Sequence, residues 1–206
     1  MSNISLPTNQ HENELRGIGF ELIAGIDEAG RGALAGPVVA AAVLLPRDCS
    51  IAGVRDSKLI AEPMREKLYD DVTSAAIAWG VGVVDHEEID RLNILQATFM
   101  AMRIAVSSLA IPPDYLLIDG RDRIDAGVPC RAVIDGDALC HSIAAASIIA
   151  KVTRDRLMRH HDELLPHYGF ARHKGYGTAT HRRAIVEHGP CSIHRRTFLR
   201  KLLAGE

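Results

Sequence analysis

The feature that most restricts the fold is a pair of short apolar segments, residues 22–26 and 38–45, joined by a glycine-rich turn. The second segment is rich in alanine, which leaves a helix open, but Pro37 and Pro46 bracket a length that is typical of a strand. Both segments are therefore predicted to be strands. Three further strands are predicted, at residues 78–84, 115–118 and 131–134.

The predicted helices follow and separate these strands. Their apolar spacing and end signals place them at residues 64–76, 85–90, 94–109, 138–159, 179–187 and 196–203. This order predicts an α/β layer fold, a central mixed β-sheet flanked by helices, with a C-terminal helical extension. We expect a flexible N-terminal segment over residues 1–19, a main domain over residues 20–165 and a basic helical part over residues 166–206 packed on that domain.

Charge is divided unevenly along the chain. Residues 151–206 contain 12 Lys and Arg and 5 Asp and Glu, whereas residues 1–150 contain 12 and 21. An acidic body with a basic end suits a protein that binds cations in one place and a polyanion beside it. Charge alone fits a solvated pair of basic helices equally well.

The composition argues against several classes of protein. The four cysteines form no C-x-x-C pair, which disfavours a structural zinc site and favours free thiols in a reducing compartment. The first twenty residues are polar and lack the apolar region of a signal peptide. The longest apolar run, residues 37–45, is too short to cross a membrane. We expect a cytoplasmic location and no membrane contact.

Acidic residues follow three of the predicted strands: Asp27 with Glu28, Asp119, and Asp137 with Asp135 close by. Functional groups gather at strand ends in open α/β sheets. Neighbouring carboxylates repel one another and are costly to bury, and a divalent cation relieves both problems. Oxygen ligands indicate Mg²⁺ or Mn²⁺ rather than zinc. The alternative for any one of these acids is a turn cap, which is the commoner role of an isolated Asp-Gly pair.

A geometric condition applies to the first pair of acids. Neighbouring residues on a strand face opposite sides, so Asp27 and Glu28 can share a site only where the strand breaks into a turn. Ala29-Gly30 is predicted to supply that break. A cation held by carboxylates commonly serves phosphate chemistry, which fits a basic C-terminal part able to hold a nucleic-acid backbone.

The turn after these acids has two interpretations. Residues 30–36 have the spacing G-x-G-x-x-x-G, a loosened form of the dinucleotide-binding fingerprint. Two acids directly before the glycines would repel a pyrophosphate, so this interpretation is the weaker one. Gly30 and Gly32, on either side of Arg31, instead permit close approach of the backbone to a ligand such as a ribose hydroxyl.

A tyrosine lies among cations and glycines in R-H-K-G-Y-G-T, residues 172–178. In a chain with 4% aromatic residues, Tyr176 between two glycines suits stacking on a sugar or base. The alternative, which is favoured when this segment is considered alone, is a helix-entry loop whose tyrosine packs on the domain.

Several motifs together strongly resemble the ribonuclease HII family, bacterial type. They are GIDEAGRGALAGPV, DSK at 56–58, EIDRLNIL at 88–95, LIDG at 117–120, SIAAASIIAKVTRD at 142–155 and YGFARHKGYGT at 168–178. The resemblance covers residues 20–198, nearly the whole chain, and its motifs are long, ordered and specific.

The resemblance implies an RNase H-like fold and an endonuclease. Such an enzyme cuts the RNA strand of an RNA–DNA hybrid and incises 5′ to single ribonucleotides embedded in duplex DNA, leaving 3′-hydroxyl and 5′-phosphate ends. Water activated on a bound Mn²⁺ or Mg²⁺ performs the hydrolysis, and the substrate phosphate helps to complete the metal site. A monomer is the family expectation. The C-terminus contains no clear peptide for contact with a sliding clamp, and Thr197-Phe198-Leu199 is only a faint apolar patch.

The resemblance also implies roles for individual residues. The metal-binding carboxylates correspond to Asp27, Glu28, Asp119 and Asp137. The substrate-binding positions correspond to Gly30, Arg31, Gly32, Tyr176, Lys58, Asn93, Ser147 and Lys151. Within this second set the glycine-arginine-glycine turn contacts the 2′-hydroxyl, the tyrosine stacks on the sugar of the following deoxynucleotide, and the other four contact phosphates. Asp135 and Asp155 lie near these motif positions but do not correspond to the metal-binding carboxylates, and Asp155 is assigned a supporting role.

The sequence departs from the family pattern at three positions. The family has proline where Ala33 and Gly177 stand here, and a second lysine where Leu59 stands. None of these departures removes a carboxylate, so we expect effects on affinity and junction discrimination more than on activity. Two alternatives stay open: a catalytically inactive hybrid-binding module of the same fold and, more weakly, a dinucleotide-binding enzyme.

Overall fold

A five-stranded mixed sheet forms the centre of the computed structural model, which describes residues 6–204. Its strands are β1 (Ile23–Ala29), β2 (Val38–Leu44), β3 (Ala78–Val84), β4 (Tyr115–Asp119) and β5 (Cys130–Val133). The order across the sheet is β3-β2-β1-β4-β5. The first three strands pair antiparallel, and β4 and β5 join them in parallel. The α/β class and the mixed sheet predicted from the sequence are confirmed.

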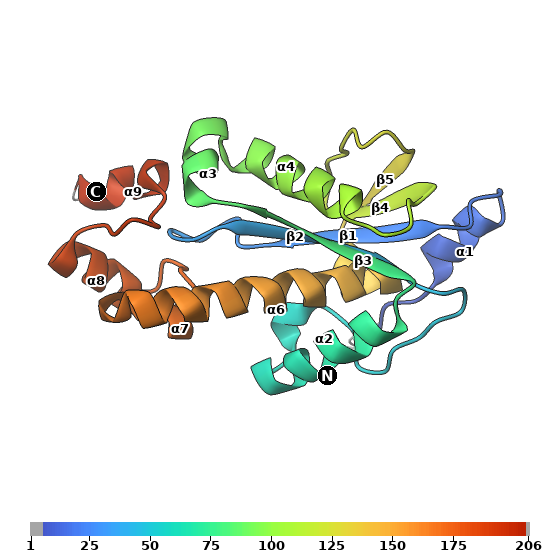
Figure 1. Ribbon diagram of the computed structural model, residues 1–206, viewed down its shortest axis with the longest axis horizontal. Coiled ribbons are helices and arrows are strands. Elements are labelled where there is room, and N and C mark those ends of the chain that lie inside the picture. Colours follow the sequence, from blue (N-terminus) through green and yellow to red (C-terminus); the bar gives the residue numbers. More distant parts are fainter. Residues whose placement is uncertain (1–5, 205–206) are drawn as a thin grey trace.

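Helices cover both faces of this sheet (Figure 1). The six predicted helices are present as α2 (Glu62–Ala75), α3 (His86–Leu92), α4 (Ile94–Ser107), α6 (His141–Leu164), α8 (Ala179–His188) and α9 (Arg196–Leu203). Sequence analysis did not predict α1 (Gln10–Arg16), α5 (Gly136–Leu139), α7 (Phe170–His173) and two 3-10 turns, Ser57–Leu59 and Pro166–Tyr168. No helix among the described residues is both long and apolar enough to cross a membrane.

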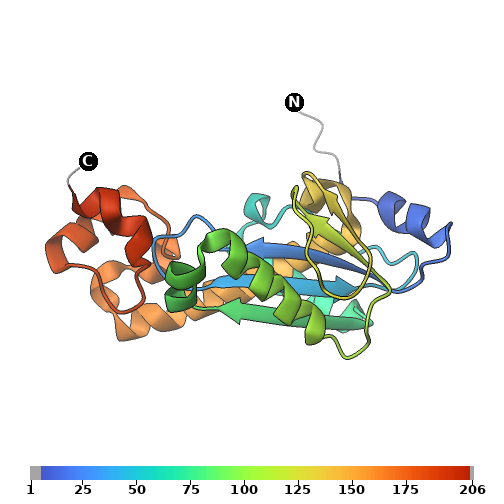
Figure 2. The ribbon, with the colours of Figure 1, turned by 90° about the horizontal axis from the view of Figure 1, so that it is seen from above.

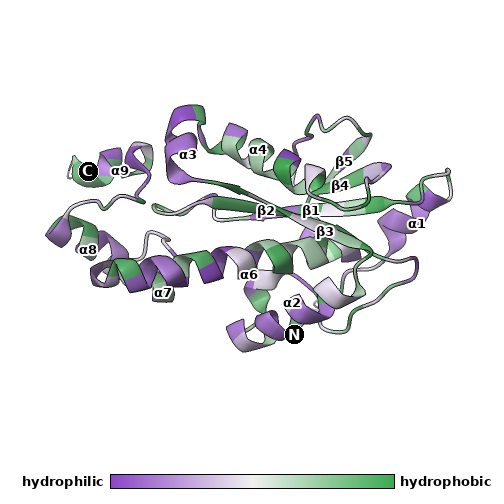
Figure 3. Ribbon diagram, viewed as in Figure 1, coloured by the Kyte–Doolittle hydropathy of each residue, from purple (hydrophilic) through white to green (hydrophobic). Residues whose placement is uncertain are grey.

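The central strand β2 explains why residues 38–45 are apolar throughout. All seven residues of β2 are buried, because α4 packs on one face of the sheet and α6 with α2 on the other. The edge strand β3 instead alternates between buried and exposed residues. In Figure 3 the hydrophobic colour is strongest along the central strands, and the hydrophilic colour is most frequent on the surrounding helices.

The N-terminal segment differs from the expectation of flexibility over residues 1–19. Residues 1–5 lie outside the described part, but Gln10–Arg16 form α1. Leu15 is buried in a cluster with Ile23 and Ile143. The carboxylate of Glu12 accepts hydrogen bonds from the backbone N–H and the hydroxyl of Ser142 in the first turn of α6. Tertiary contacts that are distant in sequence therefore order this short helix.

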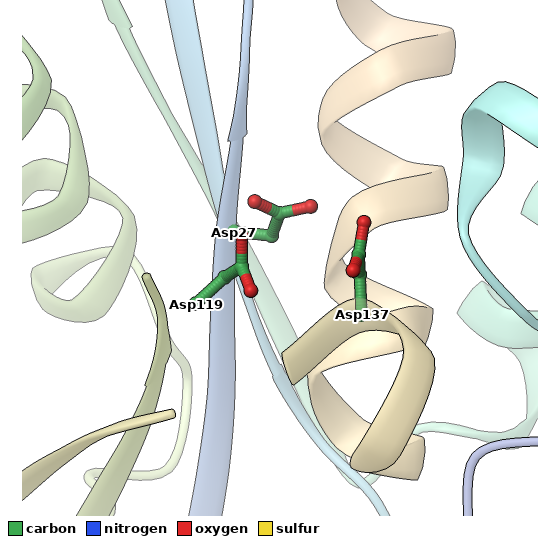
Figure 4. A group of neighbouring side chains, drawn as sticks. All are labelled: Asp27, Asp119 and Asp137. Carbon is green, nitrogen blue, oxygen red and sulfur yellow. The ribbon is translucent and has the colours of Figure 1, made fainter. Parts of the chain in front are cut away.

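The helix predicted over residues 138–159 is interrupted in the structure. Cys140 has an extended conformation, φ −109° and ψ 127°, and separates the single turn α5 from α6. The long helix then continues to Leu164. Because of this interruption α5 is not in line with α6, and its Asp137 lies beside Asp27 of β1 and Asp119 of β4 (Figure 4).

The C-terminal helices gather at one end of the sheet (Figure 2). A small apolar cluster joins Phe170, Tyr168 and Ile193 to Ala35 and Met158. Isolated backbone bridges pair Ala33 with Tyr176 and Ala35 with His194. The C-terminal part is thereby fastened to the turn between β1 and β2.

Close packing of α6 on β1 leads to a test of this architecture. A Cβ atom at Gly25 would collide with the backbone of Ser142 and Ile143. Gly25→Ala is expected to lower the free energy of unfolding by about 1–3 kcal/mol or more, as overpacked cores do. Urea unfolding measures this change.

Gly32→Ala provides the matched control, because a Cβ atom there meets nothing within 4 Å. This variant should stay within about 0.5 kcal/mol of the parent protein. Equal stability of Gly25→Ala and the parent would contradict the predicted contact between α6 and β1.

Candidate active site

A pocket of about 480 Å³ opens at the carboxyl end of β1. Its walls come from β1, the turn after it, the Ser57–Leu59 segment, α2, β4, α6 and the Tyr176 loop. The lining residues are Asp27, Glu28, Ala29, Gly30, Arg31, Gly32, Ser57, Lys58, Arg65, Asp119, Ser147, Lys151 and Tyr176.

Three acids converge beside this pocket, and two of them, Asp27 and Asp119, line it. Asp27, Asp119 and Asp137 each offer a carboxylate oxygen within 4.8 Å of the others (Figure 4). The parallel register pairs Ile26 with Ile118, so the next residues, Asp27 and Asp119, occupy neighbouring positions. The strand pairing itself therefore brings two of the acids together.

The third acid, Asp137, lies on a different element from the one expected. We predicted that Asp137 follows a strand end, but β5 ends at Val133 and Asp137 lies in α5. Asp135 adopts the left-handed conformation at φ 54°, and the carboxylate of Asp119 accepts a 2.7 Å hydrogen bond from the backbone N–H of Gly136. These two features turn Asp137 into the site and leave Asp135 exposed.

β1 continues through Asp27 and Glu28 and ends at Ala29, so the strand breaks at Ala29-Gly30 as predicted, but this break does not bring the two acids into one group. Asp27 is 3% exposed. Glu28, on the opposite face, borders a smaller pocket beside α4 and forms a 3.3 Å ion pair with Arg31. Only three of the four predicted acids therefore form the close group, although Glu28 still borders the main pocket.

Burial and mutual repulsion weaken the acids in this site. Burial raises the pKa of Asp27 well above its ordinary value, and the charges of Glu28 and Asp119 raise it further. Burial is also the main cause of the raised pKa of Asp119 and of Asp137. Partial burial acts to lower the pKa of Lys58, but the carboxylates of Asp137 and Asp27 outweigh it and raise that pKa.

Three predicted phosphate-binding residues lie in the pocket. Lys58 is exposed and forms a 3.2 Å ion pair with Asp137. The hydroxyl of Ser147 shares a 2.9 Å hydrogen bond with Ser57. Lys151 donates a 2.6 Å hydrogen bond to Asp155.

Asn93 lies elsewhere. Its side chain caps α4 by accepting hydrogen bonds from the backbone N–H groups of Leu95 and Gln96. It borders a separate shallow pocket with residues of α3 and α9. The structure therefore does not bring Asn93 together with the other predicted site residues.

Tyr176 is half-buried and borders the same pocket as Asp27 and Asp119. Its ring centroid lies 5.3 Å from the guanidinium carbon of Arg154 and 5.9 Å from the ammonium of Lys151. The glycine-arginine-glycine turn lines the same pocket, with Arg31 exposed. Both segments proposed to contact sugars therefore face one cavity.

Three residues of the pocket wall, Ala29, Ser57 and Arg65, were not among the predicted site residues. The guanidinium of Arg65 donates to the carbonyls of Ser57 and Ile60 at 2.7 and 2.6 Å, and it pairs with Asp155 at 3.4 Å. Ser57 was visible within the DSK motif, but no local signal distinguished Arg65 from other arginines on a helix. Asp155 contacts two pocket cations, Arg65 and Lys151, and does not itself line the cavity.

The sequence of this chain is similar to those of known nucleases. A family model for ribonuclease HII matches residues 24–201. Ribonuclease HII of Geobacter metallireducens is 57% identical over 187 residues, covering 91% of this chain and 88% of that protein.

Two solved structures have the same fold. RNase HII in the PCNA:RNase HII complex from Archaeoglobus fulgidus has a TM-score of 0.70 and 27% identity, covering 85% of this chain and 94% of that one. Bst-RNase HIII in complex with Mn²⁺ has a TM-score of 0.65 and 21% identity, covering 92% and 71%, a likeness that concerns the fold alone.

The fold and the pocket are those of an α/β enzyme with acidic side chains near the strand ends of a mixed sheet. The chain belongs to the ribonuclease HII family and is a nuclease. The RNase H-like fold expected from the motifs is confirmed by the solved relatives.

Burial of Asp27, together with repulsion from Glu28 and Asp119, predicts a gain in stability when its charge is neutralised. Because the folded-state pKa of Asp27 is raised, its contribution to stability is full below the ordinary value of 3.8 and is lost as the pH rises through the folded-state pKa. Asp27→Asn should therefore raise the free energy of unfolding at pH 7 in EDTA, as measured by urea unfolding. Asp71→Asn, at an exposed site on α2, is the control and should have little effect. A loss of stability in Asp27→Asn would contradict the predicted repulsion.

Proposed function

We propose that this chain hydrolyses the RNA strand of RNA–DNA hybrids and incises duplex DNA on the 5′ side of embedded ribonucleotides, leaving 3′-hydroxyl and 5′-phosphate ends. The observation that carries the proposal is the convergence of three carboxylates, two of which line the pocket that also contains the glycine-arginine-glycine turn and Tyr176. A candidate cation-binding centre and two candidate sugar contacts thus border one cavity.

The donor set fits a hard divalent cation. Asp27, Asp119 and Asp137 supply oxygen atoms only, and their raised pKa values reflect burial together with repulsion that a cation would relieve. We propose these three as ligands, with Glu28 joining from the rim of the pocket. Mg²⁺ and Mn²⁺ both suit such ligands. When bound, the ion stabilises negative charge that develops on the scissile phosphate and acidifies an attacking water.

The chain's own residues position the substrate. We propose that Lys58, Ser147 and Lys151 bind the phosphates around the scissile bond, since all three line the pocket. The glycine-arginine-glycine turn contacts the 2′-hydroxyl, and Tyr176 stacks on the sugar of the next deoxynucleotide. Asn93 as a phosphate contact stays a prediction, for a part of the duplex farther from the acids. We further propose residues 20–165 as the catalytic domain and residues 166–206 as a part that supports it.

A duplex with a single ribonucleotide tests the activity directly. With Mg²⁺ or Mn²⁺, the parent protein should nick this duplex 5′ to the ribonucleotide and cut a uniform RNA–DNA hybrid, and EDTA should abolish both reactions. The labelled products are resolved on a denaturing gel beside an all-DNA duplex, which should stay intact. Absence of cleavage with either ion would reject the proposed function and favour the inactive binding module.

Removing one acid separates catalysis from folding. Asp119→Asn should lower kcat/KM by more than about a hundredfold, because the charge of a direct ligand is lost and even outer-shell changes cost 10–100-fold. Thermal unfolding should show an intact fold. Asp122→Asn is the matched control, because that exposed aspartate lies just beyond β4 and outside the group of three acids. Full activity of Asp119→Asn would reject Asp119 as a ligand.

Loss of the tyrosine should affect junction recognition selectively. Tyr176→Ala removes a stacking surface, and base–aromatic stacking of about 1–3 kcal/mol corresponds to a loss on the order of tenfold. We expect this loss in kcat/KM for the single-ribonucleotide duplex and a smaller one for the uniform hybrid. Equal losses on the two substrates would show that Tyr176 does not sense the junction.

The dinucleotide-binding alternative is not favoured. That fingerprint requires a helix after the glycines, whereas the turn here leads into strand β2. The three carboxylates beside the turn would also repel a pyrophosphate.

The faint apolar patch at Thr197-Phe198-Leu199 is not an exposed surface. Leu199 is fully buried, Phe198 packs against the core, and Thr197 donates from its backbone to Asp90. A relative has been solved in complex with PCNA, so a clamp contact elsewhere on this chain stays a proposal. Monomeric state and cytoplasmic location also remain predictions; the four cysteines are free, as expected.

A further inference from the structure

Two arginines are buried completely without a carboxylate partner. Arg154 and Arg195 are 0% exposed, and neither forms an ion pair within the described residues. Their guanidinium groups donate instead to main-chain carbonyls, chiefly those of the turn between β1 and β2. Arg195 donates to Arg31 at 2.9 Å and to Gly36 at 3.0 Å. Arg154 donates to Pro37 at 2.9 Å, to Ala35 at 3.2 Å and to Lys174 at 2.9 Å.

Such an arrangement is expensive for a structural role alone. A buried cation without a carboxylate loses its hydration and regains only part of that energy from carbonyl dipoles. Burial, and then the charge of Arg154, lower the pKa of Arg195 to about 9. The Nη2 atom of Arg195 is also buried without a hydrogen-bond partner. What the arrangement does provide is a fixed, planar set of donors beneath the turn.

The bond to the Arg31 carbonyl is the informative one. Arg31 is the middle residue of the glycine-arginine-glycine turn, and its own side chain points toward Glu28 at the pocket rim. The backbone N–H of Arg195 also donates to the carbonyl of Leu34 at 2.9 Å. One C-terminal residue thus holds the turn at three carbonyls, those of Arg31, Leu34 and Gly36.

The preceding residue, His194, is linked to the Tyr176 loop. His194 Nδ1 accepts from the backbone N–H of Cys191 at 2.9 Å, so its proton lies on Nε2 and is donated to His181 Nε2 at 3.0 Å. His181 Nδ1 then donates to the carbonyl of Tyr176 at 3.0 Å. This chain of hydrogen bonds assigns one neutral tautomer to each histidine and ties the tyrosine to residue 194.

We propose that Arg195 is a positioning residue for ribose recognition: it fixes the glycine-arginine-glycine turn in the conformation that meets the 2′-hydroxyl, while the adjacent His194 fixes Tyr176 for the next sugar. The distance between the two sugar contacts is then set by consecutive residues of the C-terminal part. This inference rests on the proposed function, and it adds a residue that lies outside the pocket wall.

Arg195→Lys is the informative substitution, because lysine keeps the charge but cannot reproduce the planar fork of donors. Affinity is measured for a single-ribonucleotide duplex and for the same duplex in DNA, with Asp119→Asn as the common background so that neither is cut. The ratio of the two dissociation constants should fall roughly tenfold, the loss expected when one good hydrogen bond is misplaced. Affinity for the all-DNA duplex should be unchanged. A purely structural role would weaken both duplexes equally, and that result would overturn the proposal.

Arg196→Lys is the matched control. Arg196 is the next residue, is exposed, and makes no side-chain hydrogen bond among the described residues. The same chemical change at this position should leave the affinity ratio intact. An equal fall in the ratio for Arg196→Lys would also overturn the proposal, because it would assign the effect to charge near the duplex.

Hydrogen exchange gives a second measurement that needs no substrate. Amide exchange over residues 29–36 should accelerate in Arg195→Lys and stay slow in Arg196→Lys, with β2 and β4 unchanged in both. Unchanged exchange in the turn would overturn the proposal even if the affinity ratio fell.

His194→Gln, which keeps Arg195, supplies a further variant if Arg195→Lys does not fold. Its affinity ratio should fall through a loosened Tyr176 loop, and an unchanged ratio would overturn the histidine arm of the proposal. Measurements on the parent protein distinguish failure of the proposed function from failure of the inference about Arg195. If it binds both duplexes equally and cuts neither, the proposed function fails, whereas a normal ribonucleotide preference retained in Arg195→Lys rejects only this inference.

Discussion

The parallel pairing of β1 with β4 is the interaction on which the site depends. Its register, Ile26 opposite Ile118, brings two carboxylates to neighbouring positions at the same edge of the sheet. Hydrogen bonds along both strands enforce this proximity against the repulsion of the acids, which the raised pKa of Asp27 reflects. The close approach of α6 to β1 at Gly25 supports the pairing from behind. The sheet thus holds a charge arrangement that an isolated segment of the chain would relax.

Opposite charges are buried at the two sides of one turn. On the side of β1, Asp27 and Asp119 line a pocket in which few cations are fixed beside them. Lys58 is exposed, and Lys151 is already paired with Asp155. Beneath the turn, Arg154 and Arg195 contribute positive charge that no carboxylate offsets. Divalent cations would relieve the acids, whereas the two buried arginines act through the turn carbonyls to which they donate.

Much of the fold could be predicted because its signals are local. Pro37 and Pro46 marked β2, and the apolar runs before Asp27 and Asp119 marked β1 and β4. Predictions failed where contacts distant in sequence decide the structure. Glu12 orders α1 by capping α6, and the extended Cys140 interrupts what reads locally as one continuous helix. The residues near Arg65 and Arg195 carried no local signal, because an arginine that supports a site has the same sequence pattern as one on a solvated helix.

The sequence by itself determined the five strands and six of the helices in their order along the chain, the family through its motifs, and the acids available for a cation site. Only the tertiary structure decided how these acids combine: β1 continues through Glu28, which places it on the opposite face, while the left-handed turn at Asp135 brings in Asp137. The physical reason is that local patterns follow from the propensities and solvation of neighbouring residues, whereas convergence depends on strand register and on packing between segments a hundred residues apart.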